Sequence, residues 1–97
     1  MNDIIRHAVE ALAAKVAGGI DGTAKFVIEG EGAIMLDGDG ARAGAGDEDA
    51  DVTLTASVET FEGMMNGDVN PTMAFMSGKL KIDGSMSAAM KLASVLA

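Results

Sequence analysis

Residues 51–84 read DVTLTASVETFEGMMNGDVNPTMAFMSGKLKIDG, and this stretch determines the fold more clearly than any other part of the chain. The run from Val52 to Ala56 alternates apolar residues with threonines, which predicts a strand with one buried face. Ser57 is a good helix cap, and the apolar stripe that follows it ends at Gly67. The change of hydrophobic period therefore predicts a strand followed directly by a helix.

The second half of this stretch repeats the alternation of elements. Asn70 and Pro71 are typical of a cap followed by proline at the first helical position, where the missing N–H donor costs nothing. Gly78 ends this short helix, and residues 79–83 alternate again as a strand. Ser85 then caps a last helix, which carries Met86, Ala89, Met90, Ala93 and Leu96 roughly on one face with Leu92 beside them.

Upstream of residue 51 we expect one helix and a meander of strands. Residues 4–17 predict a helix capped by Asn2 or Asp3, with an apolar stripe of Ile5, Val9, Leu12 and Val16. Strands centred on Phe26 and on Ile34 are separated by Gly30-Glu31-Gly32, and an Asp-Gly turn at residues 37–40 starts the next hairpin. Residues 41–46 predict a weak strand whose small side chains leave space over that part of the sheet.

The order of elements predicts an α+β fold with a mainly antiparallel five-stranded sheet covered on one face by helices. Ninety-seven residues suit a single domain over residues 1–97. The hydrophobic fraction of 48% favours a folded chain.

The charge and composition exclude several partners. A net charge of −8 disfavours binding to nucleic acids and to anionic surfaces, and the absence of cysteine excludes disulfides and thiolate sites. The start Met1-Asn2-Asp3 lacks the pattern of a signal peptide, and no stretch has the length of a membrane span. We therefore expect a cytoplasmic protein without stable membrane insertion and leave its oligomeric state open.

No constellation of residues predicts catalysis, a metal site or a cofactor. Asp47, Asp49 and Asp51 alternate as calcium ligands do, but an EF-hand loop would need glycine at Val52 and glutamate at Val58. His7 is the single histidine and has no second imidazole or thiol near it in the sequence. We therefore predict a protein that is not an enzyme.

The apolar residues are unusual because eight methionines accompany only three aromatic residues. Methionine is flexible and adapts to irregular spaces. Three stripes are expected to face the sheet, namely Met64/Met65, Met73/Phe75/Met76 and Met86/Met90. Periodicity alone leaves two alternatives open, a closed core and a cavity lined for a ligand.

Residues 70–84, NPTMAFMSGKLKIDG, resemble the family motif of sterol carrier protein 2 domains. That motif is a proline followed by Ala-Phe-Met, then Gly-Lys-Leu-Lys and a glycine. Pro71, the run 74–76, the run 78–81 and Gly84 stand at those places. The order of elements resembles the family over nearly the whole chain. The chain departs from the pattern at Ala33, where members often have an aromatic residue, and at Ser85, where they often have aspartate.

The resemblance implies an apolar tunnel between sheet and helices that binds a fatty acid, acyl-CoA, sterol or quinone-type lipid without chemistry. By position it implies that the lining includes Ile34, Leu54, Phe61, Met64, Met65, Phe75, Met76, Met86 and Met90. A module that presents its apolar groove to a partner protein is the alternative, and a structural domain with a closed core is a third.

Overall fold

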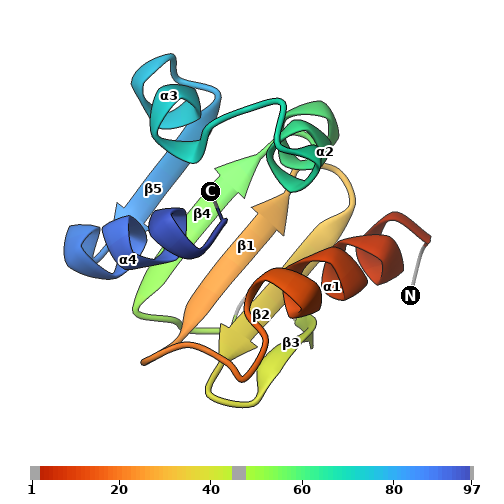
Figure 1. Ribbon diagram of the computed structural model, residues 1–97, viewed down its shortest axis with the longest axis vertical. Helices are drawn as coiled ribbons and strands as arrows, with labels where there is room; N and C mark the ends of the chain where they lie inside the picture. The colour runs from red at the N-terminus through yellow and green to blue at the C-terminus, as the bar shows by residue number, and fades with distance from the viewer. Residues whose placement is uncertain (1–2, 45–47, 97) are drawn as a thin grey trace.

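The computed structural model describes residues 3–44 and 48–96 of the 97-residue chain (Figure 1). The elements, in chain order, are α1 (Asp3–Lys15), β1 (Ala24–Ile28), β2 (Gly32–Asp37), β3 (Gly40–Gly44), β4 (Val52–Ala56), α2 (Val58–Asn66), α3 (Pro71–Met76), β5 (Leu80–Gly84) and α4 (Met86–Leu96). No helix in this part of the chain has both the length and the apolar character needed to cross a bilayer.

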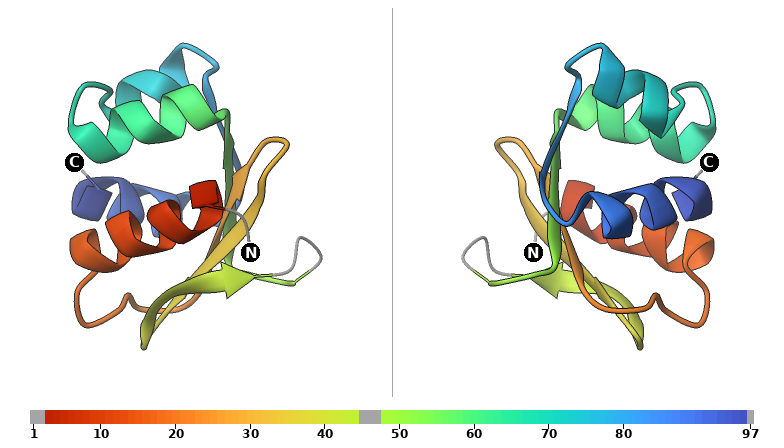
Figure 2. Two further views of the ribbon diagram at one scale, coloured as in Figure 1. Left: turned by 90° about the vertical axis from the view of Figure 1, so that its right-hand side faces the viewer. Right: turned by 90° about the vertical axis from the view of Figure 1, so that its left-hand side faces the viewer.

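The five strands form one sheet in the order β3-β2-β1-β4-β5. The central pair, β1 and β4, is parallel, whereas the other neighbours are antiparallel, so the sheet is mixed rather than purely antiparallel. All four helices lie on one face of the sheet (Figure 2). The predicted α+β class and the helix layer on one face are confirmed.

The predicted caps explain where α2 and α3 begin. The Ser57 Oγ atom accepts a hydrogen bond from the Thr60 N–H at 3.2 Å. The Asn70 Oδ1 atom accepts hydrogen bonds from the N–H groups of Thr72 and Met73 at 2.8 and 3.2 Å. These bonds satisfy donors that the helix itself leaves unpaired. Proline follows the second cap at position 71 without losing a hydrogen bond.

Large side chains form a row across the middle of the helix-covered face. Strand register aligns Ile34, Phe26, Leu54 and Ile82 on β2, β1, β4 and β5. Phe26 is fully buried, and its ring meets the Phe61 ring of α2 edge to face with centroids 4.9 Å apart. Edge-to-face aromatic pairs add to the stabilisation that burial alone provides. This row therefore forms a tightly filled core.

The next row of the same face has smaller side chains on β1, β4 and β5. Here Leu36, Ala24, Val52 and Gly84 are aligned, at the ends where β1 and β4 begin. Alanine and glycine cannot reach a helix that packs about 10 Å above the sheet. The sheet itself therefore leaves space beneath the helix that covers this row.

The expectation of space over residues 41–46 is wrong for the described part of that strand. Helix α1 packs closely against β3, and Ala41 contacts the core. The small side chains of β3 thus allow α1 to approach the sheet rather than leaving room above it. Residues 45 and 46 lie outside the described part of the chain.

The opposite face of the sheet carries Met35, which is buried although no helix covers it. Glu48 lies over this face, where the Lys25 Nζ atom donates to its carbonyl oxygen at 2.9 Å. The Glu48 carboxylate accepts a hydrogen bond from Arg42 at 3.1 Å, and this bond together with its negative charge raises the pKa of that guanidinium. Glu48 is thereby held against the back of the sheet.

Candidate functional site

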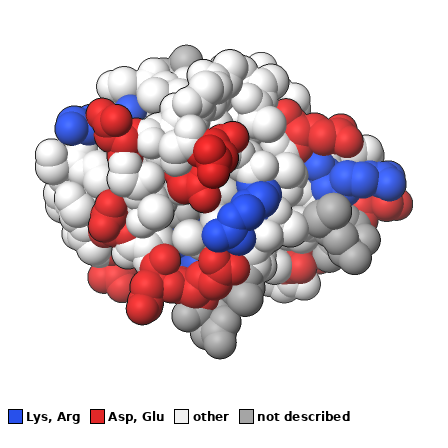
Figure 3. All heavy atoms as spheres, turned by 90° about the horizontal axis from the view of Figure 1, so that it is seen from below, with Lys and Arg blue, Asp and Glu red and all other residues white. Residues whose placement is uncertain are grey.

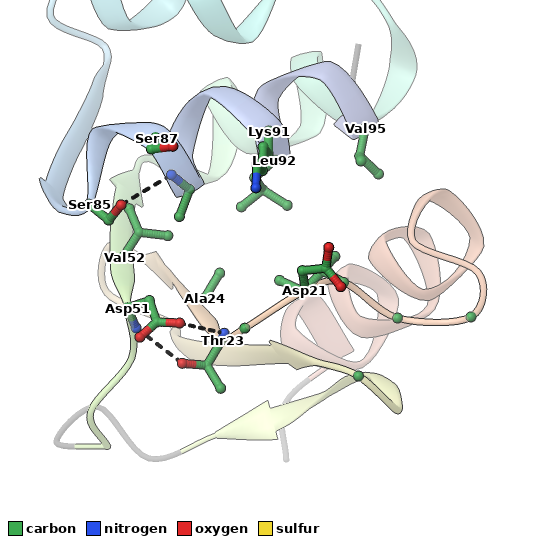
Figure 4. Close-up of a pocket in the computed structure, with 16 residues that line it drawn as sticks. Asp21, Thr23, Ala24, Asp51, Val52, Ser85, Ser87, Lys91, Leu92 and Val95 are labelled. Carbon is green, nitrogen blue, oxygen red and sulfur yellow. Dashed lines mark hydrogen bonds between the residues drawn. The ribbon is translucent and has the colours of Figure 1, made fainter.

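A cavity of about 840 Å³ lies between α4, the starts of β1 and β4, and the loop that joins α1 to β1 (Figure 4). Its apolar lining comes from Ile20, Ala24, Val52, Ala88, Leu92 and Val95. Its polar lining comes from Asp21, Thr23, Asp51, Ser85, Ser87 and Lys91, with four glycines at positions 18, 19, 22 and 38. A volume in this range is typical of sites for small molecules.

The position of this cavity follows from the sequence of the sheet and of α4. Ala24 and Val52 belong to the row of small side chains and form part of its lining. Helix α4 contributes Ala88 and Leu92 from above. A short side chain at residue 88 and a short side chain at residue 24 leave the space between them unfilled.

Hydrogen bonds between Thr23 and Asp51, called the clasp below, connect two walls of the cavity. The Thr23 N–H donates to the Asp51 Oδ2 atom at 3.1 Å, and the Asp51 N–H donates to the Thr23 hydroxyl oxygen and carbonyl oxygen, each at 3.1 Å. The Ser85 N–H donates to the Asp51 carbonyl oxygen at 3.0 Å. Asp51 therefore joins the start of β1 to the start of α4 and fixes the distance between two walls of the cavity.

Two glycines are required for the chain to pass this closely. Gly19 has φ +88, and a Cβ atom there would collide with the Gly38 carbonyl oxygen. Gly84 has φ +104, and its Cβ atom would lie 2.5 Å from the Asp51 carbonyl oxygen. Positive φ and close backbone approach are both properties that glycine provides.

The mouth of the cavity carries charges of both signs. Lys91 of α4 lies across the cavity from Asp21 and Asp51 (Figure 4). No ion pair in the described ranges involves Lys91. Seen from this end of the molecule, acidic side chains outnumber basic ones (Figure 3). The polar residues Asp21, Thr23 and Asp51 come from the segments that precede β1 and β4, whereas the strand residues of the lining are apolar.

A second, much smaller cavity of about 30 Å³ lies on the other side of α4. It is lined by Leu54, Pro71, Thr72, Phe75, Leu80, Ile82, Met86, Ala89, Met90 and Ala93. Val52 in the first cavity and Leu54 in the second are successive residues on the same face of β4. The two cavities are therefore neighbours along β4 and α4, where Leu92 lines the first cavity and Ala89 lines the second.

The nine residues proposed from the sequence as lipid-lining divide into three groups. Ile34, Leu54, Phe61 and Met64 are buried in the core, and Met65 is half-buried against it. Phe75, Met86 and Met90 line the small cavity together with Leu54. Met76 is 75% exposed. The larger cavity contains none of the nine.

The expectation that all three methionine stripes face the sheet is wrong for two of them. Met64 packs in the core, but Met73 and Met76 point to solvent, and Met86 and Met90 are about half exposed. Helix α4 instead buries Ala89 and Leu92. Since α4 turns these two residues towards the sheet, the methionines of the helix are directed outwards.

Sequence reasoning missed the residues of the larger cavity. No sequence motif marks the turn after α1, and Asp51 stands out only as the third member of the alternating Asp47, Asp49 and Asp51. A usable signal was present, because Ala24 and Ala88 are small apolar residues within a strand and a helix. Finding it required the parallel pairing of β1 with β4, which places residue 24 beside residue 52.

The sequence matches the SCP-2 sterol transfer family over residues 1–97. It is 45% identical over 74 residues to hydroxysteroid dehydrogenase-like protein 2 of Bos taurus, an alignment that covers 70% of this chain. The chain spans 18% of that relative's length.

Solved structures show the same fold. The crystal structure of sterol carrier protein 2 like 2 from Aedes aegypti has a TM-score of 0.78 at 23% identity, with 95% of each chain covered. The solution structure of sterol carrier protein 2 from Aedes aegypti, in complex with palmitate, has a TM-score of 0.76 at 17% identity, covering 100% of this chain and 97% of that one. The match over the whole sequence, supported by the shared fold, shows that the chain belongs to the SCP-2 sterol transfer family.

Proposed function

We propose that this chain is a non-catalytic carrier that binds one lipid with a single alkyl chain in the space beneath α4. The observation that supports this most is the cavity of about 840 Å³ between α4 and the sheet. The palmitate complex of a protein with the same fold supports a fatty acid as the ligand class. We further propose that residues 1–97 act as one domain, and a cytoplasmic location stays a prediction.

The layout of the two cavities favours one orientation of the ligand. The polar rim with Lys91, Ser87 and Asp21 suits a headgroup, because a buried headgroup without partners would be costly. The alkyl chain would lie over Val52 and continue beneath α4 towards Leu54. Small outward movement of α4 would join the two cavities.

The methionines at the small cavity would receive the end of the chain. Its present volume of about 30 Å³ has no room for an alkyl chain, so Met86 and Met90 must change rotamer. Both side chains are about half exposed and therefore free to do so. In this proposal Phe75, Met86, Met90 and Leu54 keep the lining role that the sequence suggested for them.

The expected free energy of binding an alkyl chain is sufficient for a lipid carrier. Each buried methylene contributes about 0.8 kcal/mol, so roughly fifteen of them contribute about 12 kcal/mol, of which about 8 kcal/mol remains after an entropic cost of binding of about 4 kcal/mol. That is enough for micromolar affinity without a strong charged anchor.

The experiment that tests the proposal is organic extraction of the purified protein followed by mass spectrometry. A lipid present in stoichiometric amount, and absent from a protein prepared in the same way, would support the carrier function and identify the ligand. Binding of a fluorescent fatty acid is measured in parallel on delipidated protein. Absence of both bound lipid and probe binding would refute the proposal.

A variant that fills the cavity links the binding to this site. We expect Ala88→Phe to reduce probe affinity at least tenfold, because its ring would occupy the space between α4 and β4. Ala13→Phe is the matched control, since Ala13 is exposed on α1. Equal affinity of the two variants would place the ligand elsewhere.

A further inference from the structure

The methionines of this protein divide into protected and accessible ones. Met73, Met76, Met86 and Met90 have large exposed surfaces on α3 and α4. Met64, by contrast, is 1% exposed in the core. The chain contains no cysteine, so its methionine thioethers are the only sulfur groups available to an oxidant. Because exposure governs how readily a thioether is oxidised, we expect the four accessible methionines to react while Met64 is protected.

Two of the accessible methionines also line the small cavity. Met86 and Met90 are 48% and 58% exposed, and both belong to its lining, whereas Met73 and Met76 do not. The two lining methionines are four positions apart on α4 and therefore lie on the same side of that helix. Thr72 is the one polar residue among the ten described residues that line this cavity. The side chains of Met86 and Met90 are therefore in contact with solvent and with an apolar space at the same time.

The reaction of a thioether with a peroxide is balanced without any further reactant. A sulfur lone pair attacks one peroxide oxygen, the O–O bond breaks, and that oxygen stays on the sulfur atom as a sulfoxide. The proton of the transferred hydroxyl passes to the leaving oxygen, so the peroxide is reduced to water or, for an organic hydroperoxide, to an alcohol. The sulfoxide is polar, and burying its oxygen without a hydrogen-bond donor is unfavourable. Among the described residues that line the small cavity, the Thr72 hydroxyl is the one side-chain donor.

We propose that Met86 and Met90 form an oxidation site through which peroxides weaken the binding of long-chain lipids. This inference rests on the proposed function, in which the end of the alkyl chain enters the small cavity. Oxidation places a sulfoxide oxygen on each of two side chains that surround the chain end, so the alkyl chain loses apolar contacts there. Methionine sulfoxide reductases reverse the reaction, because both side chains are accessible from solvent.

The packing of α4 separates this effect from the stability of the fold. The helix buries Ala89 and Leu92, whose alkyl side chains do not react with a peroxide. Met64 is protected in the core, and Met35 is buried on the opposite face of the sheet. Oxidation of the accessible methionines therefore changes the lining of the small cavity and leaves the packed core unmodified.

The larger cavity should be insensitive to the same oxidant. None of the described residues that line it is a methionine. A short alkyl chain that ends over Val52 stays in the larger cavity, whereas a long chain continues past Leu54 to the two methionines of α4. We therefore expect oxidation to reduce affinity for a long chain and to leave affinity for a short chain nearly unchanged. This dependence on chain length distinguishes a local change in the small cavity from general damage to the protein.

The test measures binding of palmitate and of decanoate by calorimetry on delipidated protein, before and after treatment with hydrogen peroxide. Mass spectrometry of peptides locates the sulfoxides. We expect sulfoxides at Met86 and Met90, a loss of palmitate affinity of about tenfold and a loss of decanoate affinity of less than about twofold. Incubation with methionine sulfoxide reductases should restore the affinity for palmitate.

Matched variants assign the effect to the small cavity, and each variant is compared with itself before and after oxidation. Met86→Leu with Met90→Leu keeps an apolar lining without thioethers, so its palmitate affinity should not change on oxidation. Met73→Leu with Met76→Leu removes the accessible methionines outside the cavity. This control should lose palmitate affinity on oxidation as the unmodified chain does.

The outcomes separate this inference from the proposed function. An equal loss of affinity in the Met86→Leu with Met90→Leu variant would overturn the inference. So would unchanged palmitate affinity in a chain that carries sulfoxides at both residues, or the absence of sulfoxides at both. Absence of palmitate binding before any oxidation would refute the proposed function itself, and the inference with it.

Discussion

The two halves of the helix layer are packed in different ways. Beneath α1 and α2 the core is filled by large side chains, and Leu12, Phe26 and Met64 have almost no exposed surface. Beneath α4 the contacts are made by Ala89 and Leu92, and the space beside them is open. One half therefore supplies the stability of the fold, while the other half has room for a ligand and exposes its long apolar side chains.

The largest effect is expected in the filled half. Phe61→Ala would remove the ring that packs on Phe26 and leave a cavity under α2. We expect the free energy of unfolding to fall by about 3–5 kcal/mol, measured by chemical denaturation. A loss of less than about 1 kcal/mol would mean that this half is as loosely packed as the other.

The loop at the boundary between the halves should show an intermediate effect. Gly19→Ala combines positive φ with a collision against the Gly38 carbonyl oxygen, and we expect a loss of about 3 kcal/mol in denaturation experiments. Gly18→Ala is the control, because its φ is +87 and a Cβ atom there has open space. It should cost only about 1 kcal/mol. Equal costs would show that the close approach of the two loops does not matter.

Substitutions in the open half should change binding more than stability. Met90→Gln should alter the free energy of unfolding by less than about 0.5 kcal/mol, because the side chain is 58% exposed. It should weaken binding of a long-chain fatty acid about tenfold, since the amide would meet the alkyl chain. Titration with a fluorescent fatty acid measures this. Met73→Gln lies outside the small cavity and should bind as before, so a similar loss in both variants would contradict the proposed path of the chain.

The smallest effect is expected at the mouth of the open half. Lys91→Gln should weaken binding of a fatty acid about two- to fivefold and leave binding of the alcohol with the same chain length unchanged. The effect is small because Lys91 is exposed and faces two carboxylates across the cavity. Competition between the fatty acid and the alcohol, measured by calorimetry, gives the ratio of their two affinities directly. An equal loss for both ligands would mean that Lys91 acts through packing and not through its charge.

The filled half could be predicted from the sequence, and the open half could not. Period-two and helical patterns placed Phe26, Leu54 and Leu12 correctly, because large apolar residues with regular spacing have one way to be buried. The caps at Ser57 and Asn70 were also predicted, since they depend on local hydrogen bonds.

The cavity depends instead on pairings between distant residues. Residue 24 lies beside residue 52 only because β1 and β4 are parallel, and no local pattern encodes that choice. The exposed methionines were misjudged for a related reason. Periodicity places Met86 and Ala89 on one broad apolar stripe of α4. It does not show that Ala89 lies against the sheet while Met86, at the edge of the stripe, is half exposed.

The clasp between Thr23 and Asp51 has a consequence for the order of folding. These residues are 28 positions apart, whereas the hairpins β1–β2, β2–β3 and the unit β4–α2 are local. Loop closure over long separations costs more entropy, so we expect the hairpins to form first and the clasp to close late. A ligand held by walls that the clasp completes would then stabilise contacts that are absent from the folding transition state. It would slow unfolding while leaving the folding rate almost unchanged, which makes a loaded carrier longer-lived rather than faster to assemble.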